Sequence, residues 1–133
     1  MAIADTSGIP VAAHILSAWP HEVKLVEETI DSGFTRYAPN KLIADKAYDN
    51  EALDQRLLDE RNVQMIAPQR KGRKKPKTQD GRKLLPYRRR WKIERVFAWL
   101  QNFRRLVIRC EYHADNFLGM IQLGCIIILL RFF

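Results

Sequence analysis

Cysteine is scarce in this chain of 133 residues, and its placement excludes two kinds of scaffold. Cys110 and Cys125 have no CxxC or Cys/His ligand spacing, so neither a zinc site nor a disulfide framework is indicated. His14 and His21 also lack a ligand partner at a fixed spacing, which favours structural roles for both. The sequence therefore predicts reduced thiols, as in the cytosol.

Targeting and membrane signals are also missing. No basic segment precedes the first apolar residues, so the N-terminus does not resemble a signal peptide. The apolar run that starts at Phe117 is shorter than the roughly 20 residues of a spanning helix, and Gly119, Gln122 and Gly124 interrupt it. We expect an apolar core helix over 114–133, no membrane association, and a cytoplasmic protein.

Acidic residues are outnumbered, which indicates a polyanionic partner. The chain has 15 Asp and Glu against 23 Lys and Arg, for a net charge of +8. Length and composition fit one small folded domain. A strongly basic domain of this size suits a polyanionic partner such as nucleic acid or an acidic membrane face.

Basic residues concentrate between Gln69 and Arg90, where eleven of the 23 lie against Asp80 alone. Residues 69–86 have no apolar period, which predicts a loop. A solvated loop that serves only solubility is the simpler interpretation, but the charge density favours phosphate binding. The predicted DNA contacts in this loop are Arg70, Lys71, Arg73, Lys74 and Lys75. Such contacts position DNA without reading its sequence.

The remaining pattern alternates strands and helices. We expect, in chain order, a hairpin around the turn Asp5–Gly8, a helix over 20–30, a strand over 41–45, a helix capped by Asp49 or Asn50, a strand over 63–68 and a helix over 87–108. This order indicates an α/β layer with some parallel pairing.

Glu94 is the one acid in the predicted helix 87–108. On that helix Tyr87, Arg90, Glu94 and Gln101 fall within roughly 60° of one another. The neighbouring apolar face is predicted to contain Ile93, Val96, Phe97 and Leu100, and we place Trp91 and Trp99 in the core as well. The simplest interpretation of Glu94 is a surface ion pair with Arg90 at i,i+4.

Asp45 follows the predicted strand 41–45 at its carboxyl end, where ligands of open α/β sheets usually bind. A turn or helix-capping role is the simpler interpretation of this single acid. The combination with Glu94 and a basic loop fits phosphoryl transfer, which uses hard oxygen ligands for Mg²⁺ and cations around the phosphodiester.

Two segments carry a family resemblance. Residues Tyr87, Arg90 and Glu94 match the Y-x2-R-x3-E signature of DDE transposases from bacterial insertion sequences, and the segment IADKAYDNEAL resembles the one that carries their second catalytic Asp. The segments ERVFAWLQNFRRL and R-x-E at Arg109–Glu111 are also similar, and the insertion-sequence-five-like group resembles this chain most. The similarity covers most of the chain and is tightest over 42–111.

The resemblance implies a ribonuclease-H-like fold, DNA transposition, and Mg²⁺ or Mn²⁺ held by three acids. Asp45 would be the second acid and Glu94 the third, both as catalytic residues and metal ligands. Tyr87 and Arg90 would hold DNA, as would Arg104 and Arg105. Gln101 stands where the family has a lysine. Self-association and a location at the bacterial nucleoid are also implied.

The first acid has no good match. Asp5 lies in a D-x-x-G-x-P turn that resembles a structural position of the family and is a weak substitute. We therefore expect a partial catalytic domain over 1–133 that lacks the first strand and has an extra C-terminal helix. Either an upstream-encoded segment supplies the missing acid, or the gene is a remnant.

Two other classes of function stay open on the sequence. The first is a non-enzymatic basic nucleic-acid-binding module, in which Asp45 and Glu94 are surface acids. The second is a membrane-bound peptide anchored through 117–133, which would need detergent.

Overall fold

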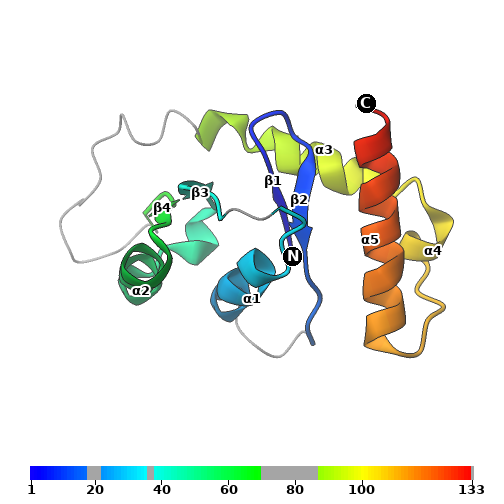
Figure 1. The fold of residues 1–133 in the computed structure, drawn as a ribbon, viewed down its shortest axis with the longest axis horizontal. Coiled ribbons are helices and arrows are strands. Elements are labelled where there is room, and N and C mark those ends of the chain that lie inside the picture. The colour runs from blue at the N-terminus through cyan, green and yellow to red at the C-terminus, as the bar shows by residue number, and fades with distance from the viewer. Residues whose placement is uncertain (18–21, 36–37, 70–86, 133) are drawn as a thin grey trace.

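The computed structural model describes residues 1–17, 22–35, 38–69 and 87–132. It is a mixed α/β structure with two small sheets and five α-helices among these residues. Figure 1 shows the two sheets side by side, with α5 at the opposite end of the molecule from β3 and β4.

The N-terminal segment forms the predicted hairpin. β1 (Ala2–Ala4) pairs antiparallel with β2 (Pro10–Ala13). Asp5 shapes the turn, because its Oδ1 accepts hydrogen bonds from the backbone N–H of Ser7 and of Ile9, each at 2.8 Å. Gly8 completes the turn with φ +82°, a conformation that favours glycine. Asp5 therefore has the structural role that its motif predicts.

The middle of the chain forms a βαβ arrangement, in agreement with the predicted α/β layer with some parallel pairing. The 3-10 turn η1 (Glu22–Lys24) leads into α1 (Leu25–Asp31). β3 (Lys41–Ile43) pairs in parallel with β4 (Gln64–Ile66), and the crossover between them consists of η2 (Lys46–Tyr48) and α2 (Glu51–Arg61). Asn50 is the N-cap of α2, where its Oδ1 accepts from the backbone N–H of Ala52 and Leu53. Of the two residues predicted as the cap, Asp49 and Asn50, the N-cap is therefore Asn50.

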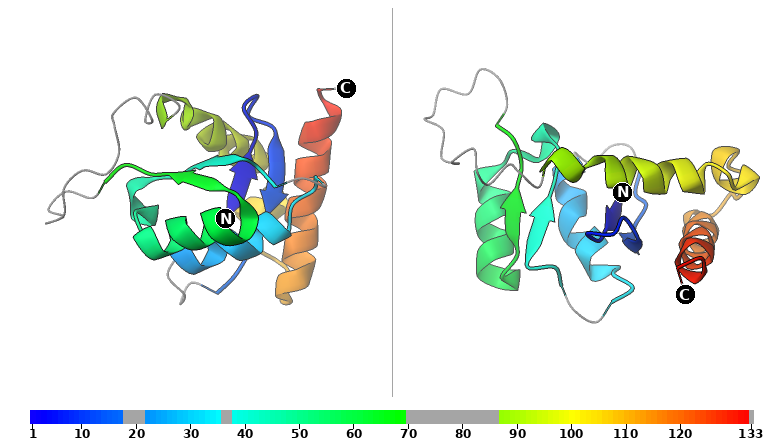
Figure 2. Two further views of the ribbon diagram at one scale, coloured as in Figure 1. Left: turned by 60° about the vertical axis from the view of Figure 1, so that its left-hand side comes forward. Right: turned by 90° about the horizontal axis from the view of Figure 1, so that it is seen from above.

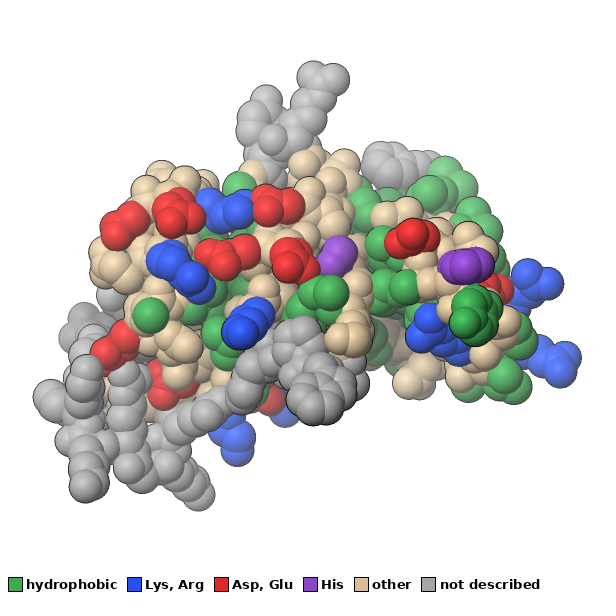
Figure 3. All heavy atoms as spheres, turned by 90° about the horizontal axis from the view of Figure 1, so that it is seen from below, with side chains coloured by type: hydrophobic (Ala, Val, Ile, Leu, Met, Phe, Trp, Pro, Cys, Tyr) green, Lys and Arg blue, Asp and Glu red, His purple; other side chains and the backbone are tan. Residues whose placement is uncertain are grey.

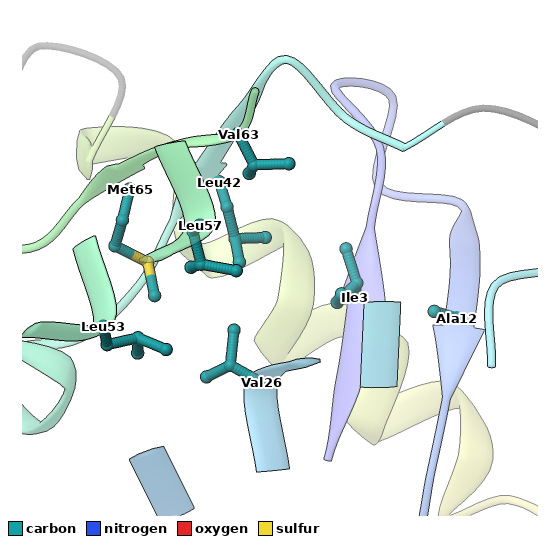
Figure 4. Close-up of a cluster of buried hydrophobic side chains, with 8 residues drawn as sticks. All are labelled: Ile3, Ala12, Val26, Leu42, Leu53, Leu57, Val63 and Met65. Atoms are coloured by element: carbon teal, nitrogen blue, oxygen red, sulfur yellow. The ribbon is translucent and has the colours of Figure 1, made fainter. Parts of the chain in front are cut away.

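Both sheets contribute to one hydrophobic core. Figure 4 shows its eight buried side chains, which come from both sheets, α1, α2 and the link between α2 and β4: Ile3, Ala12, Val26, Leu42, Leu53, Leu57, Val63 and Met65. Although they share this core, β1 and β3 are not hydrogen-bonded to each other among the described residues. Each sheet therefore has an edge strand that faces the other sheet across the core.

The structure divides the predicted helix 87–108 in two. α3 (Trp91–Leu100) and α4 (Arg104–Val107) are separated by a turn in which Phe103 is extended. Gly124 of α5 accommodates the residues around this turn, since its missing side chain lets Leu100, Phe103 and Leu106 pack closely on that helix. The interruption comes from tertiary packing, because Gln101–Phe103 contains neither glycine nor proline.

α5 (Ala114–Leu130) lies within the predicted range 114–133. It packs against β2 and α3 in a second core cluster of Ala13, Val96, Leu100, Cys125 and Ile128. None of the helices in the described ranges is long and apolar enough to span a bilayer.

Candidate functional site

Asp45 and Glu94 approach one guanidinium group, although they lie in segments far apart in the sequence. The Arg90 Nη1 atom is 3.7 Å from Asp45 Oδ2, and its Nη2 atom is 3.5 Å from Glu94 Oε1. The Tyr87 hydroxyl donates a hydrogen bond of 3.2 Å to Asp45 Oδ1 and accepts one of 2.9 Å from Arg90 Nη1. The structure therefore brings four of the predicted site residues into one cluster.

Two elements position the carboxylates. Asp45 comes two residues after the parallel strand β3, at its carboxyl end. Glu94 lies in the first turn of α3, which Val96 and Leu100 hold against the core. Figure 2 shows α3 running from the β3–β4 sheet toward α4 and α5, so that its N-terminal end lies near β3.

Both carboxylates also have the simple roles that the sequence allows. Asp45 Oδ1 accepts a 2.6 Å hydrogen bond from the backbone N–H of Lys46 and is the N-cap of η2. Glu94 pairs with Arg90 at i,i+4 and lies near the positive end of the α3 dipole. These roles leave the outer parts of the side chains accessible, since 50% of Asp45 and 61% of Glu94 side-chain surface is exposed.

Arg90 is the electrostatic centre of the cluster. Its guanidinium lies 5.5 Å from the centroid of the Tyr87 ring, in addition to the contacts with both acids. Its hydrogen bond and charge interaction with Tyr87, followed by the charges of Glu94 and Asp45, raise the pKa of Arg90 above its usual value. A permanent positive charge therefore stands between two exposed carboxylates.

The carboxylate oxygens of Asp45 and Glu94 are the type of ligand atom that a divalent ion binds. Carboxylate oxygens are the ligands that Mg²⁺ prefers, and one Mg²⁺ commonly uses one or two carboxylates together with water and substrate phosphate. The described residues contain no group of three acids, histidines or cysteines that could hold a metal ion. Asp45 and Glu94 are thus suited to part of an ion's ligand shell, with other ligands completing it.

The other predicted DNA contacts lie away from this cluster or outside the described residues. Arg70, Lys71, Arg73, Lys74 and Lys75 belong to the segment 70–86, which the structure does not describe. Arg104 and Arg105 are exposed on α4, beyond the far end of a ten-residue helix that is about 15 Å long. Arg105 Nη1 lies 3.8 Å from Glu111 Oε1.

The tryptophan prediction is half wrong. Trp99 is partly buried and packs beside the α5 cluster, as predicted. Trp91 is 49% exposed and contacts the guanidinium of Arg95, whose contribution the sequence analysis missed. Phe97 is also exposed, at 44%, and does not belong to the buried face of α3. Helical spacing showed that these residues share a side, but only the tertiary packing decides which side is closed.

The histidines fit structural roles where they are described. His14 Nε2 lies 3.3 Å from Glu28 Oε2, a contact that joins the end of β2 to α1. His21 lies outside the described residues. Both cysteines are free, with Cys125 buried and Cys110 exposed, as the sequence indicates.

Known proteins resemble this chain over nearly its full length. The family described as "Transposase DDE domain" matches residues 1–130. A putative transposase for insertion sequence element IS402 from Burkholderia cepacia is 33% identical over 134 residues, which cover 95% of this chain and 59% of that protein. The chain therefore spans about three fifths of the length of this relative. No solved structure matches the chain.

Proposed function

Because the chain belongs to the DDE transposase family of insertion sequences, we propose that Asp45 and Glu94 are two acids of a metal-dependent site for DNA cleavage and strand transfer. The observation that carries this proposal is the contact of both acids with Arg90 and of Asp45 with Tyr87. These contacts join the two sequence segments that resemble the family's catalytic motifs.

Asp45 and Glu94 would hold a Mg²⁺ or Mn²⁺ ion through their exposed oxygens. Such an ion supplies positive charge at the phosphate under attack. Arg90 occupies the space between the two carboxylates, where it reduces their mutual repulsion. When the acids bind an ion, the Arg90 guanidinium becomes available to a DNA phosphate, and the Tyr87 hydroxyl keeps Asp45 oriented.

The charges of the described helices favour DNA on the α3 side. α1 and α2 together contain seven acidic and two basic residues, and Figure 3 shows acidic side chains gathered on this part of the surface. α3 and α4 contain four basic residues and Glu94 as their one acid. A polyanion approaching this molecule is attracted to α3 and α4 and repelled by α1 and α2. Glu94 is therefore an acid placed on the DNA-facing side.

The two open sheet edges support a ribonuclease-H-like arrangement with a further strand. β1 and β3 share a core without pairing to each other, so an extended segment between them would join both sheets into one. A strand parallel to β3 would end near Asp45, where it would deliver the first acid. We place this strand in sequence outside these 133 residues, encoded upstream. The complete protein would act in the bacterial cytoplasm at the nucleoid.

Nicking of a DNA duplex in the presence of Mn²⁺ tests this function. The chain is assayed alone and with the upstream segment, each time with Asp45→Asn, Glu94→Gln and the control Asp115→Asn, an exposed acid of α5. We expect nicking in the mixture that is lost in the first two variants and kept in the control. Nicking that survives both Asp45→Asn and Glu94→Gln would contradict the assignment.

A non-enzymatic nucleic-acid-binding module is the second candidate. It is favoured by the capping role of Asp45 and by the lack of a third acid near the pair among the described residues. Melting temperature separates the two candidates, because an ion that binds the folded protein stabilises it. A Mn²⁺-dependent rise that Glu94→Gln removes supports the enzyme, and indifference to both supports the binding module.

A further inference from the structure

Arg95 connects α3 to the hairpin through two kinds of contact. Its guanidinium lies between two indole rings of the same helix, 5.1 Å from the Trp91 centroid and 4.7 Å from the Trp99 centroid. Its Nη2 atom donates a 2.7 Å hydrogen bond to the backbone carbonyl of Ser7. The spacing of i−4, i and i+4 places the three side chains on one stripe of α3.

The hairpin turn is shaped to receive this side chain. Asp5 holds the turn rigid through hydrogen bonds with Ser7 N–H and Ile9 N–H, and the Thr6 carbonyl accepts a bond from Lys92 Nζ. Gly8 permits the close approach, because a Cβ built at this position would lie 2.5 Å from Arg95 Nη2. Two basic side chains of α3 therefore bind two successive carbonyl groups of one turn.

These contacts supply direction where α3 meets the hairpin and the C-terminal helix, an interface that is otherwise apolar. The N-cap residue of α3, Arg90, makes no side-chain capping hydrogen bond, and Val96 and Leu100 contribute apolar packing. Apolar burial has little directionality, so it permits small shifts along a helix axis, whereas a hydrogen bond to a fixed carbonyl does not. Glu94 is the neighbour of Arg95 in sequence, so a shift of α3 would move it relative to Asp45.

We propose that Arg95, stacked between Trp91 and Trp99 and bonded to the Ser7 carbonyl, is a positioning residue that fixes α3 on the hairpin and so sets Glu94 opposite Asp45. The consequence for the metal site rests on the proposed function, whereas the placement of α3 does not. Arginine is required over lysine, because only the planar guanidinium can stack between two rings while its edge donates hydrogen bonds.

A distance measurement tests the positioning directly. Spin labels are attached to Ala52→Cys in α2 and Ala98→Cys in α3, two exposed alanines, in a Cys110→Ser background. Cys125 stays unlabelled, because burial raises the pKa of its thiol to about 11. Arg95→Lys should broaden the distance distribution by at least the rise of one helical residue, about 1.5 Å. Gly8→Ala should also broaden the distance distribution, because it disturbs the same contact on the hairpin side.

Two controls separate positioning from general destabilisation. Arg89→Lys changes an exposed arginine that lies before α3 begins, six residues ahead of Arg95, and Val26→Ala removes core volume in α1. Both should leave the distribution unchanged, although Val26→Ala lowers the melting temperature. An unchanged distribution in Arg95→Lys, or equal broadening in Val26→Ala, overturns the proposal.

Mn²⁺ affinity, measured from the signal of free Mn²⁺, links the positioning to the site. Arg95→Lys should weaken binding severalfold, whereas Arg89→Lys should not. If Mn²⁺ binding is insensitive to Glu94→Gln while Arg95→Lys still broadens the distance, the proposed function fails and the positioning role stands.

Discussion

Arg90 occupies a position between two acids that a divalent ion would also use. Its two terminal nitrogens lie 3.7 Å and 3.5 Å from Asp45 and Glu94. The guanidinium and a bound ion therefore compete for the same carboxylate charge. Because the acids and Arg90 are about half exposed, this cluster contributes little to folding stability.

We predict that Arg90→Gln raises the affinity for Mn²⁺, by up to about tenfold, because it removes a competing positive charge near solvent. The same change should weaken DNA binding. Titration with Mn²⁺ and a DNA-binding assay at fixed salt measure the two effects, and Arg89→Gln is the matched control. A loss of Mn²⁺ affinity in Arg90→Gln would show that Arg90 organises the acids instead of competing for them.

Asn62 is the C-cap residue of α2 and has an unusual backbone conformation. It has φ 55°, in the left-handed region, and its side chain is exposed. We predict that Asn62→Val lowers the free energy of unfolding by about 1–2 kcal/mol, the usual cost of this conformation for a bulky residue. Asn62→Gly should match or slightly exceed the original stability. Urea unfolding measures both, and equal stability of the Val and Gly variants would refute the prediction.

At the scale of elements, the ends of α1 and α2 are joined by the Arg61–Asp31 pair. Arg61 Nη2 donates a 3.0 Å hydrogen bond to Asp31 Oδ2, and Arg61 Nη1 also contacts Asp31 Oδ1. The hydrogen bond from Arg61 lowers the pKa of Asp31 below its ordinary value of 3.8. The folded state therefore favours the charged carboxylate.

The pKa of Asp31 is lower in the folded state than in the unfolded state, so the pair stabilises the protein fully at pH values above the unfolded-state pKa. This stabilisation is lost as pH falls through the folded-state pKa. We predict that Asp31→Asn costs less than about 1 kcal/mol at pH 7, since the Asp31 side chain is 59% exposed and screened by solvent. The difference between the variant and the original should begin to shrink as pH drops below 3.8 and disappear below the lower pKa of the folded state. Unfolding curves at pH 7 and in acid test this, and a difference that persists in acid would contradict it.

The sequence predicted elements where one local signal decides them. The Asp5–Gly8 turn follows from its turn residues. The capping residue of α2 was predicted as Asp49 or Asn50 and is Asn50, and the predicted parallel pairing joins β3 to β4. The break between α3 and α4 was missed because no local residue signals it, and the residues around it pack on Gly124, which is far along the chain.

The candidate site shows the same division. Motif spacing identified Asp45, Tyr87, Arg90 and Glu94, and the structure brings them together, although their roles stay predictions. Arg95 was missed because its importance depends on the Ser7 carbonyl, which lies 88 residues away. The Trp-x3-Arg-x3-Trp spacing was the one local signal, and it does not reveal which rings are exposed.

At the scale of the whole molecule, charge is unevenly distributed. The helices α1 and α2 are acidic, and α3 and α4 are basic. On the proposed function, this polarity would orient DNA before any specific contact forms.

We predict that Arg104→Gln combined with Arg105→Gln reduces the salt dependence of DNA binding. If both arginines contact phosphates, the slope of log K against log salt concentration should decrease in magnitude by about 1.8. Arg56→Gln, on the acidic side and 3.6 Å from Glu27, is the control and should leave the slope unchanged. Equal slopes for the double variant and the original chain would remove α4 from the DNA surface.

The α5 helix gives the molecule a second uneven surface. Its mean hydropathy is high, yet Leu123, Ile126 and Leu130 are exposed on it. A helix that is apolar on all sides is usually covered. Self-association, which the family resemblance implies, would cover this side of α5, and sedimentation of Ile126→Glu against the original chain tests it. The variant should sediment as a smaller species. Unchanged sedimentation would show that self-association does not use this side of α5.

The most direct test of the central claim is Mn²⁺ binding by the purified chain, read from the signal of free Mn²⁺. The original chain should bind, Asp45→Asn and Glu94→Gln should each lose most of the affinity, and Asp115→Asn should retain it. Equal loss in the two variants would establish that both carboxylates share one ion. Unchanged affinity in both variants would contradict the account and leave Asp45 and Glu94 as a cap and a surface ion pair.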